Sequence, residues 1–154
     1  MPRDLATYLK DHYAGSTGGT RLCRQIADTA SDGATKTEAS SIADAIEADQ
    51  RKLLDIMGRL DVTPSRFKAI GARLGELGGR GKLRASSADG RVLQFEAMIM
   101  GVTGKLRLWH SLGELAATVP GLDAEELEAL KARAKDQRTR LGQLHLAAAR
   151  ELDG

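Results

Sequence analysis

The feature that most constrains the fold is a repeat of apolar or small residues at steps of three and four. This spacing places such residues on one face of an α-helix. It occurs in four segments, which contain Leu5, Leu9, His12, Ser16, Gly19, Cys23, Ile26 and Ala30; Ile42, Ile46, Asp49, Leu53, Ile56 and Leu60; Val92, Phe95, Ile99, Val102, Leu106, Trp109, Gly113 and Ala116; and Leu127, Leu130, Ala134, Gln137, Leu141, Leu144 and Ala148. No segment alternates as a strand would, so an all-α fold is predicted.

Turn and capping residues divide these stripes into separate helices. Asp32-Gly33 supplies the first turn, and Thr35 or Thr37 is expected to cap the second helix. Val119-Pro120-Gly121 ends the third long helix. Asp123 with Glu126 three residues later is a capping-box pattern that begins the fourth.

An additional short helix is predicted between the second and third stripes. Thr63-Pro64 is typical of a helix start, with proline at the first helical position. The apolar face of this segment is expected to pack on the bundle and consists of Phe67, Ile70, Leu74 and Leu77. The sequence therefore predicts one domain, residues 1–154, with helices at about 4–30, 36–60, 64–78, 91–118 and 123–152.

The lengths of the connections predict the path of the chain. About five residues join helices one and two, and likewise the last two, so each pair should be antiparallel. About thirty residues separate the second and third long helices, enough to cross the bundle and make them parallel. This connectivity belongs to ferritin-like folds. We therefore expect a ferritin-like four-helix bundle with a long crossover.

Composition argues against several classes of partner and compartment. The 23 basic and 21 acidic residues give a net charge of +2, too balanced to indicate nucleic-acid binding. No run approaches 18 apolar residues, so no membrane span is expected, and the N-terminus lacks an apolar signal core. Cys23, the only cysteine, allows no internal disulfide, and a reducing cytoplasm is expected. One basic face, a candidate docking surface in the crossover, consists of Arg66, Lys68, Arg73, Arg80, Lys82 and Arg84.

Several stretches share a pattern with one group of proteins. They are residues 8–16 (YLKDHYAGS), 49–54, 59–62, 104–109 (GKLRLW) and 136–138, together with Leu141. In these stretches the chain resembles uncharacterised bacterial proteins that have a ferritin-like four-helix bundle. The similarity spans nearly the whole chain and implies the fold. The group has no established activity that the resemblance could imply.

The ligand set of a ferritin-like di-metal site is incomplete. Such a site needs inward carboxylates from two helices and Glu-x-x-His from the other two. The residues three positions before the histidines are Leu9, Arg107 and Gly142, so no Glu-x-x-His is present. We therefore expect no metal pair in the bundle and no cofactor.

Two smaller sets of polar residues are candidate sites. His12, Asp49, Glu96 and Gln137 come one from each long helix, and at one level they would hold a single metal ion or form a buried polar network. At different levels they would bond to one another or to water. His110 and Glu114 share a helix face and would form a ligand pair, an acid–base pair or an ordinary intrahelical hydrogen bond.

Three glycines interrupt the first helical stripe. Gly15, Gly18 and Gly19 could belong to a phosphate-binding loop, but the Walker spacing and a preceding strand are missing. A continuous helix explains the unbroken stripe better, although each glycine costs about 1 kcal/mol relative to alanine. We expect these glycines to contact another helix closely, in the same chain or in a second copy.

Three functions remain compatible with the sequence. The favoured one is a non-enzymatic helical scaffold that acts by protein association, as a homo-oligomer. The first alternative is a metal-binding or oxidative-stress protein with an atypical carboxylate site. The second alternative is a protein that binds a small apolar ligand between its helices.

Overall fold

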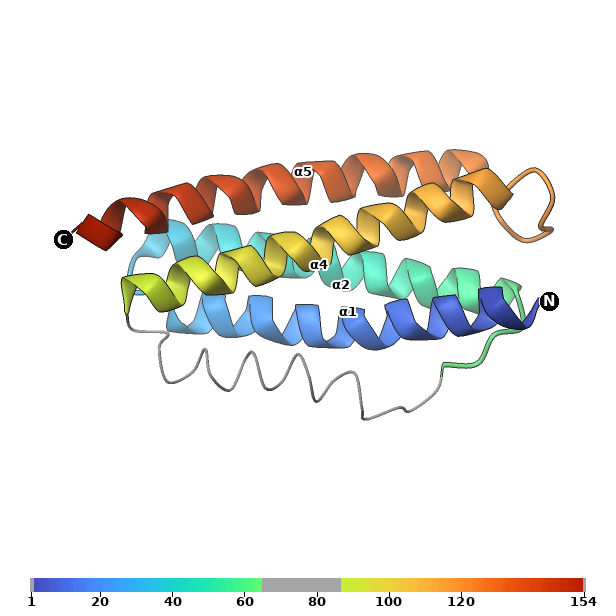
Figure 1. Ribbon diagram of the computed structural model, residues 1–154, viewed down its shortest axis with the longest axis horizontal. Coiled ribbons are helices and arrows are strands. Elements are labelled where there is room, and N and C mark those ends of the chain that lie inside the picture. The colour runs from blue at the N-terminus through green and yellow to red at the C-terminus, as the bar shows by residue number, and fades with distance from the viewer. Residues whose placement is uncertain (1, 65–86, 154) are drawn as a thin grey trace.

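The described part of the chain folds into four long helices that lie side by side (Figure 1). The structure is a computed structural model that describes residues 2–64 and 87–153. These residues contain no β-strand, which confirms the predicted all-α class. The elements are α1 (Arg3–Thr29), α2 (Gly33–Arg59), α4 (Ala88–Leu115), α5 (Ala124–Ala149) and a short 3-10 helix, η1 (Arg150–Asp153).

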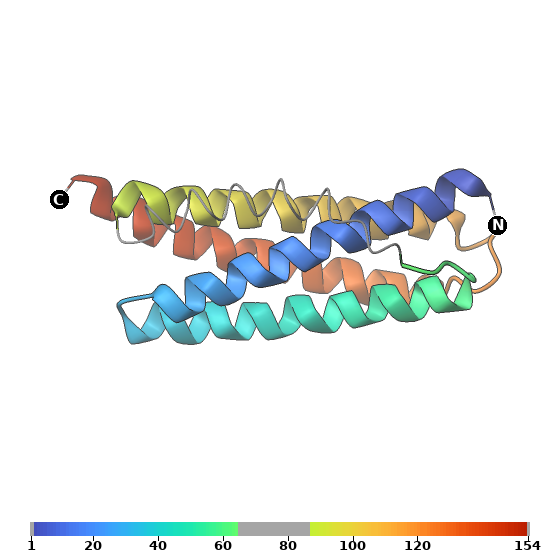
Figure 2. The same ribbon diagram turned by 90° about the horizontal axis from the view of Figure 1, so that it is seen from below.

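The helices form two antiparallel pairs, α1 with α2 and α4 with α5 (Figures 1 and 2). In both views α2 and α4 run in the same direction, as the connection lengths predict. The expected crossover helix, its apolar face and its basic residues fall on residues 65–86, which lie outside the described part of the chain. Only Thr63 and Pro64, at its predicted start, are described.

The N-cap residues explain where two of the helices begin. Asp32 accepts a hydrogen bond from the backbone N–H of Thr35 at 2.7 Å, so α2 begins three residues before its predicted start. The expectation that Thr35 or Thr37 caps this helix was wrong, because Asp32 is the N-cap and its carboxylate accepts from the Thr35 N–H within the first turn. Asp123 accepts from the Glu126 N–H at 2.7 Å, as predicted.

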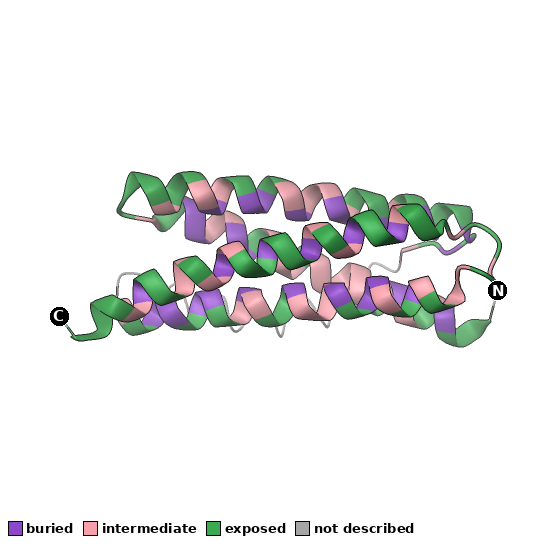
Figure 3. Ribbon diagram, turned by 90° about the horizontal axis from the view of Figure 1, so that it is seen from above, coloured by how far each residue is buried: buried purple, intermediate pink, exposed green. Residues whose placement is uncertain are grey.

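The core lies along the inward faces of the four helices (Figure 3). Every member of the predicted α2 stripe is buried, and so are most members of the α5 stripe. Trp109 and several leucines and isoleucines have less than 2% of their surface exposed. Packing of these stripes is the main source of stability, since each fully buried large apolar side chain contributes about 1.5–3 kcal/mol.

Charged side chains join neighbouring helices at the rim of the core. Arg24 on α1 reaches two carboxylates of α2, Glu47 at 2.8 Å and Asp44 at 2.5 Å. Arg140 on α5 contacts Glu38 of α2 at 2.5 Å. Ion pairs at the surface contribute little to the free energy of unfolding. Their main effect here is on the relative orientation of the helices. In the described part of the chain, no helix is long and apolar enough to span a membrane.

Candidate functional site

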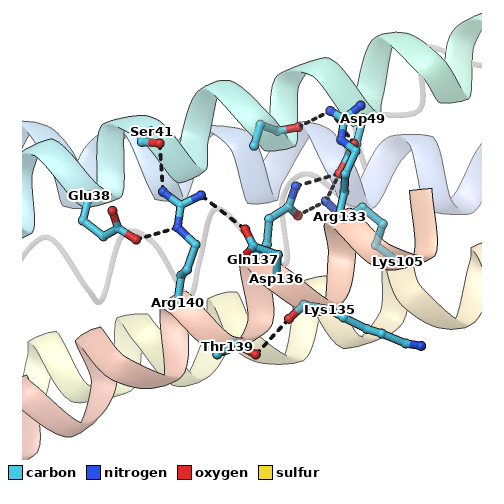
Figure 4. Close-up of polar contacts among 11 residues, drawn as sticks. Glu38, Ser41, Asp49, Lys105, Arg133, Lys135, Asp136, Gln137, Thr139 and Arg140 are labelled. Atoms are coloured by element: carbon cyan, nitrogen blue, oxygen red, sulfur yellow. Dashed lines mark hydrogen bonds and ion pairs between the residues drawn. The ribbon is translucent and has the colours of Figure 1, made fainter. Parts of the chain in front are cut away.

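A cluster of polar side chains is buried at the centre of the bundle (Figure 4). Asp49 of α2 is fully buried, and Gln137 of α5 is 1% exposed. Asp49 Oδ2 accepts hydrogen bonds from Lys105 Nζ of α4 at 2.6 Å and from Gln137 Nε2 at 2.8 Å. Lys105 also donates to Gln137 Oε1. Three helices therefore contribute to one closed set of hydrogen bonds.

A second cation, Arg133 of α5, approaches the same carboxylate from the surface. One nitrogen of its guanidinium group lies 2.8 Å from Asp49 Oδ1, and the two groups form an ion pair. The contact does not have the geometry of a hydrogen bond. Its side chain is 39% exposed, whereas that of Lys105 is 13% exposed. With two cations and one anion, the cluster of Asp49, Lys105, Arg133 and Gln137 carries one net positive charge when all three charged groups are ionised.

The position of Lys105 determines the electrostatics of the cluster. Removal from water disfavours the charged ammonium, so burial lowers the pKa of Lys105. The adjacent Asp49 carboxylate acts in the opposite direction and stabilises the ammonium. A buried lysine is tolerated here because a carboxylate and an amide oxygen replace its water shell.

A cavity of about 460 Å³ lies beside this cluster, between α1, α2 and α4. Its polar boundary includes Asp49 and Lys105. Most of the remaining wall is apolar and includes Leu22, Leu53 and Trp109. The cluster therefore adds charged groups to a cavity whose wall is mainly apolar, although Asp11, His12 and Gln50 also line it.

Glycines create much of this space. Gly15 and Gly19 of α1 and Gly101 and Gly104 of α4 all line the cavity. A Cβ atom added at any of these four positions would meet no described atom of a neighbouring segment within 4 Å. Because larger side chains set the spacing of the helices elsewhere, the side chains missing at these four positions leave space unfilled.

This gap corrects the expectation for the first helix. The helix is continuous through its glycines, as predicted. The expected close contact of Gly15 and Gly19 with the third or fourth helix of the same chain is absent among the described residues. The physical reason is that Gly101 and Gly104 of α4 line the same cavity, so at these positions neither helix supplies a side chain to fill the space. Gly18 lines the same cavity.

His12 lies at the cavity and packs against Tyr8. The two rings meet edge to face with their centroids 4.6 Å apart. Partial burial lowers the pKa of His12, and the nearby Asp11 carboxylate opposes this effect. His12 is therefore held toward its neutral form in the folded protein.

The lowered pKa of His12 predicts a pH dependence of stability. In the unfolded chain His12 should titrate near its ordinary pKa of about 6.5. The unfolded state therefore binds a proton at His12 at a higher pH than the folded state does. The part of the folding stability that depends on neutral His12 is present above the unfolded pKa and is lost as the pH falls through the folded pKa. We expect His12→Gln to lose less stability than the wild type between pH 7.5 and 5.5, as measured by urea denaturation. Equal losses in the two proteins would contradict this prediction.

The structure brings together only part of the expected four-residue site. Asp49 and Gln137 are hydrogen-bonded, as one form of that hypothesis requires. Glu96 instead lies at the surface and contacts His145 of α5 at 3.2 Å, so its grouping with Asp49 was wrong. Glu96 is not a member of the α4 stripe: it follows the buried Phe95 by one position and is exposed, as the stripe itself indicates.

Lys105 also bears on the metal hypothesis. Its ammonium group binds the oxygen atoms of Asp49 and Gln137 that a metal ion would need. Within the part of the chain that the structure describes, no three His, Cys, Asp or Glu side chains are grouped as metal ligands. A bound cation would therefore have to displace Lys105 from both partners.

The remaining sequence candidates do not form a second site. His110 is half-buried and Glu114 is exposed, and the structure gives no hydrogen bond or ion pair between these two described residues. Cys23 is buried, and its thiol donates to the carbonyl oxygen of Ala39 at 3.5 Å. Burial raises the pKa of Cys23 to about 11, which suits a packed side chain and not a nucleophile.

Comparison of the chain with known protein families, with curated proteins and with solved structures gave no match to any of them. The case for a function therefore depends on the cluster and the cavity beside it.

Proposed function

We propose that this protein is a non-enzymatic binding protein that holds a small, largely apolar molecule between α1, α2 and α4. The cavity of about 460 Å³ carries this proposal. Ligand pockets in proteins usually measure about 300–1,000 Å³ and combine apolar walls with a few polar groups. The walls beside Lys105 and Asp49 have this composition.

The energetic cost of the cavity supports a role for it. Glycine within a helix costs about 1 kcal/mol relative to alanine, and Gly15 and Gly19 both lie in the middle of α1. The atoms around an empty space also lose dispersion contacts that a filled core would provide. A ligand in the cavity would restore those contacts, so an arrangement that is costly for the free protein becomes favourable in the complex.

Trp109 provides a direct test of this proposal, because it is the only tryptophan and lines the cavity. We expect titration with octanol, a short apolar alcohol, to change its fluorescence in a saturable manner. Isothermal titration calorimetry should give a matching affinity. The absence of both a fluorescence change and a binding heat would contradict the proposal.

Self-association as a ferritin-like scaffold is the second candidate. The parallel direction of α2 and α4, which is the connectivity of ferritin-like proteins, supports that fold assignment. Leu93 and Met100, which are 53% and 67% exposed, lie seven residues apart on α4 and so on one helix face. Analytical ultracentrifugation should show a mass that rises with concentration, and Met100→Lys should reduce that rise. A constant monomer mass would contradict this candidate.

A further inference from the structure

The cavity is long and narrow. The residues that line it extend from Tyr8 to Leu22 on α1 and from Ala97 to Trp109 on α4. Since an α-helix rises about 1.5 Å per residue, these two stretches span a length of about 18–21 Å. A volume of about 460 Å³ spread over that length gives a mean width of about 5 Å. Neighbouring extended chains in a β-sheet lie about 4.7–4.9 Å apart. The cavity is therefore about as wide as one extended chain.

Leu22 shares its level of the bundle with Ala97 and Met98. Tyr8 of α1 donates a hydrogen bond to Ser111 of α4 at 3.3 Å, so these two residues lie at one level. The two helices run in opposite directions (Figures 1 and 2). Moving from Tyr8 to Leu22 along α1 therefore corresponds to moving back from Ser111 to Ala97 and Met98 along α4.

Ile46 of α2 lies near the same level. Arg24, two positions after Leu22, contacts carboxylates that flank Ile46 along α2, those of Asp44 and Glu47. The described lining residues that meet at this level are all apolar. They are Leu22, Ile46, Ala97 and Met98, and we call this part of the cavity the apolar end.

The charged lining residues lie away from the apolar end. Asp49 and Lys105 are 2.6 Å apart, so within the cavity wall their charges compensate each other. Asp11 lies three positions after Tyr8, near the opposite end, and is exposed to water. An anionic ligand group beside Asp11 would be repelled, and a cationic one would gain only the small energy of a surface ion pair. Because a buried charge is costly unless it is paired, an uncharged polar group is favoured over either ion.

We infer that the ligand is an unbranched aliphatic molecule with one uncharged polar end, such as a long-chain alcohol. Its hydrocarbon chain lies along the cavity and points toward Leu22 and Ile46 at the apolar end. Its hydroxyl group stays near Tyr8 and the exposed Asp11, where water can reach it. This inference rests on the proposed binding function and specifies the shape, charge and orientation of the ligand.

Calorimetric titration of the wild type with decanol and with 1-adamantanol tests the shape of the ligand. The two alcohols have the same number of carbon atoms, but 1-adamantanol is a compact cage that is wider than an extended chain. Decanol should bind at least about tenfold more tightly. From octanol to dodecanol, each CH₂ group that the cavity removes from water should tighten binding about fourfold.

Ala97→Leu tests the orientation, because it adds a larger side chain at the apolar end. With the hydroxyl group near Tyr8, dodecanol reaches Ala97 and octanol does not. The variant should therefore weaken the binding of dodecanol about tenfold and change that of octanol little. Ala132→Leu is the matched control, since Ala132 is an exposed residue of α5 that does not line the cavity, and it should change neither affinity.

The outcomes separate this inference from the proposed function. Equal binding of decanol and 1-adamantanol by the wild type would overturn the inference of an unbranched chain but leave the cavity proposal standing. An equal effect of Ala97→Leu on octanol and dodecanol, or an effect on neither, would overturn the orientation. A wild type that binds none of these alcohols would overturn the proposed function as well.

Discussion

Replacement of Asp49 by alanine is expected to lower the free energy of unfolding by about 3–5 kcal/mol, because it leaves Lys105 as a buried cation without its carboxylate. Gln137 would also lose the acceptor of its amide N–H. The measurement is urea denaturation at neutral pH. Asp55→Ala is the matched control, since Asp55 is an exposed residue of the same helix and should change stability by no more than about 0.5 kcal/mol.

A double variant tests whether the loss comes from the uncompensated charge. Apolar residues of similar volume often replace a buried ion pair at little cost. Asp49→Leu combined with Lys105→Met should therefore recover much of the stability that Asp49→Ala loses, since Arg133 can extend into water. Equal stabilities of Asp49→Ala and Asp55→Ala would contradict the assignment of Asp49 to a tightly coupled cluster.

Much of the fold could be predicted because one physical requirement controls it. A helix in a bundle must bury one face, and the steps of three and four in Leu53, Ile56 and Leu60 identify that face directly. Connection lengths then determine which neighbours are antiparallel. The helix ends were less certain, because Asp32 and Thr35 are both competent N-caps and sequence alone does not decide between them.

The candidate site was only partly predictable, because its central cation does not belong to any stripe. Lys105 lies beside Leu106 of the α4 stripe, and a lysine next to an apolar stripe is usually exposed. Its partner Asp49 is 56 positions away, so only the relative levels of α2 and α4 bring them together. A signal did exist, however. Asp49 and Gln137 occupy positions in otherwise apolar stripes, and buried polar groups require partners.

The cavity could not be anticipated, because it arises from side chains that are missing on two helices at once. The glycines of α1 alone suggest close approach by another helix, the arrangement that small residues permit. The glycines of α4 give no indication of a cavity by themselves, since Gly101 follows the buried Met98 and Gly104 follows the buried Val102 in the same helix. Only the folded structure shows that both sets of glycines line one cavity.

Leucine in place of Gly19 is therefore expected to abolish or strongly weaken the binding of octanol while the protein stays folded. The new side chain would extend into the cavity, where a Cβ at this position meets no described neighbour within 4 Å. Stability should stay level or rise by up to about 1 kcal/mol, since leucine favours the helix more than glycine does. Sequence alone predicts the opposite, a loss of about 1–3 kcal/mol by overpacking.

Calorimetric titration and urea denaturation of Gly19→Leu decide between these outcomes. Gly142→Leu is the matched control, because Gly142 lies within α5, does not line the cavity and also has open space beyond its Cα. This control should gain similar stability and bind octanol as the wild type does. A loss of about 1–3 kcal/mol confined to Gly19→Leu would instead show that another segment or a second copy already fills the space. The glycines of α1 would then serve close packing and not the admission of a ligand.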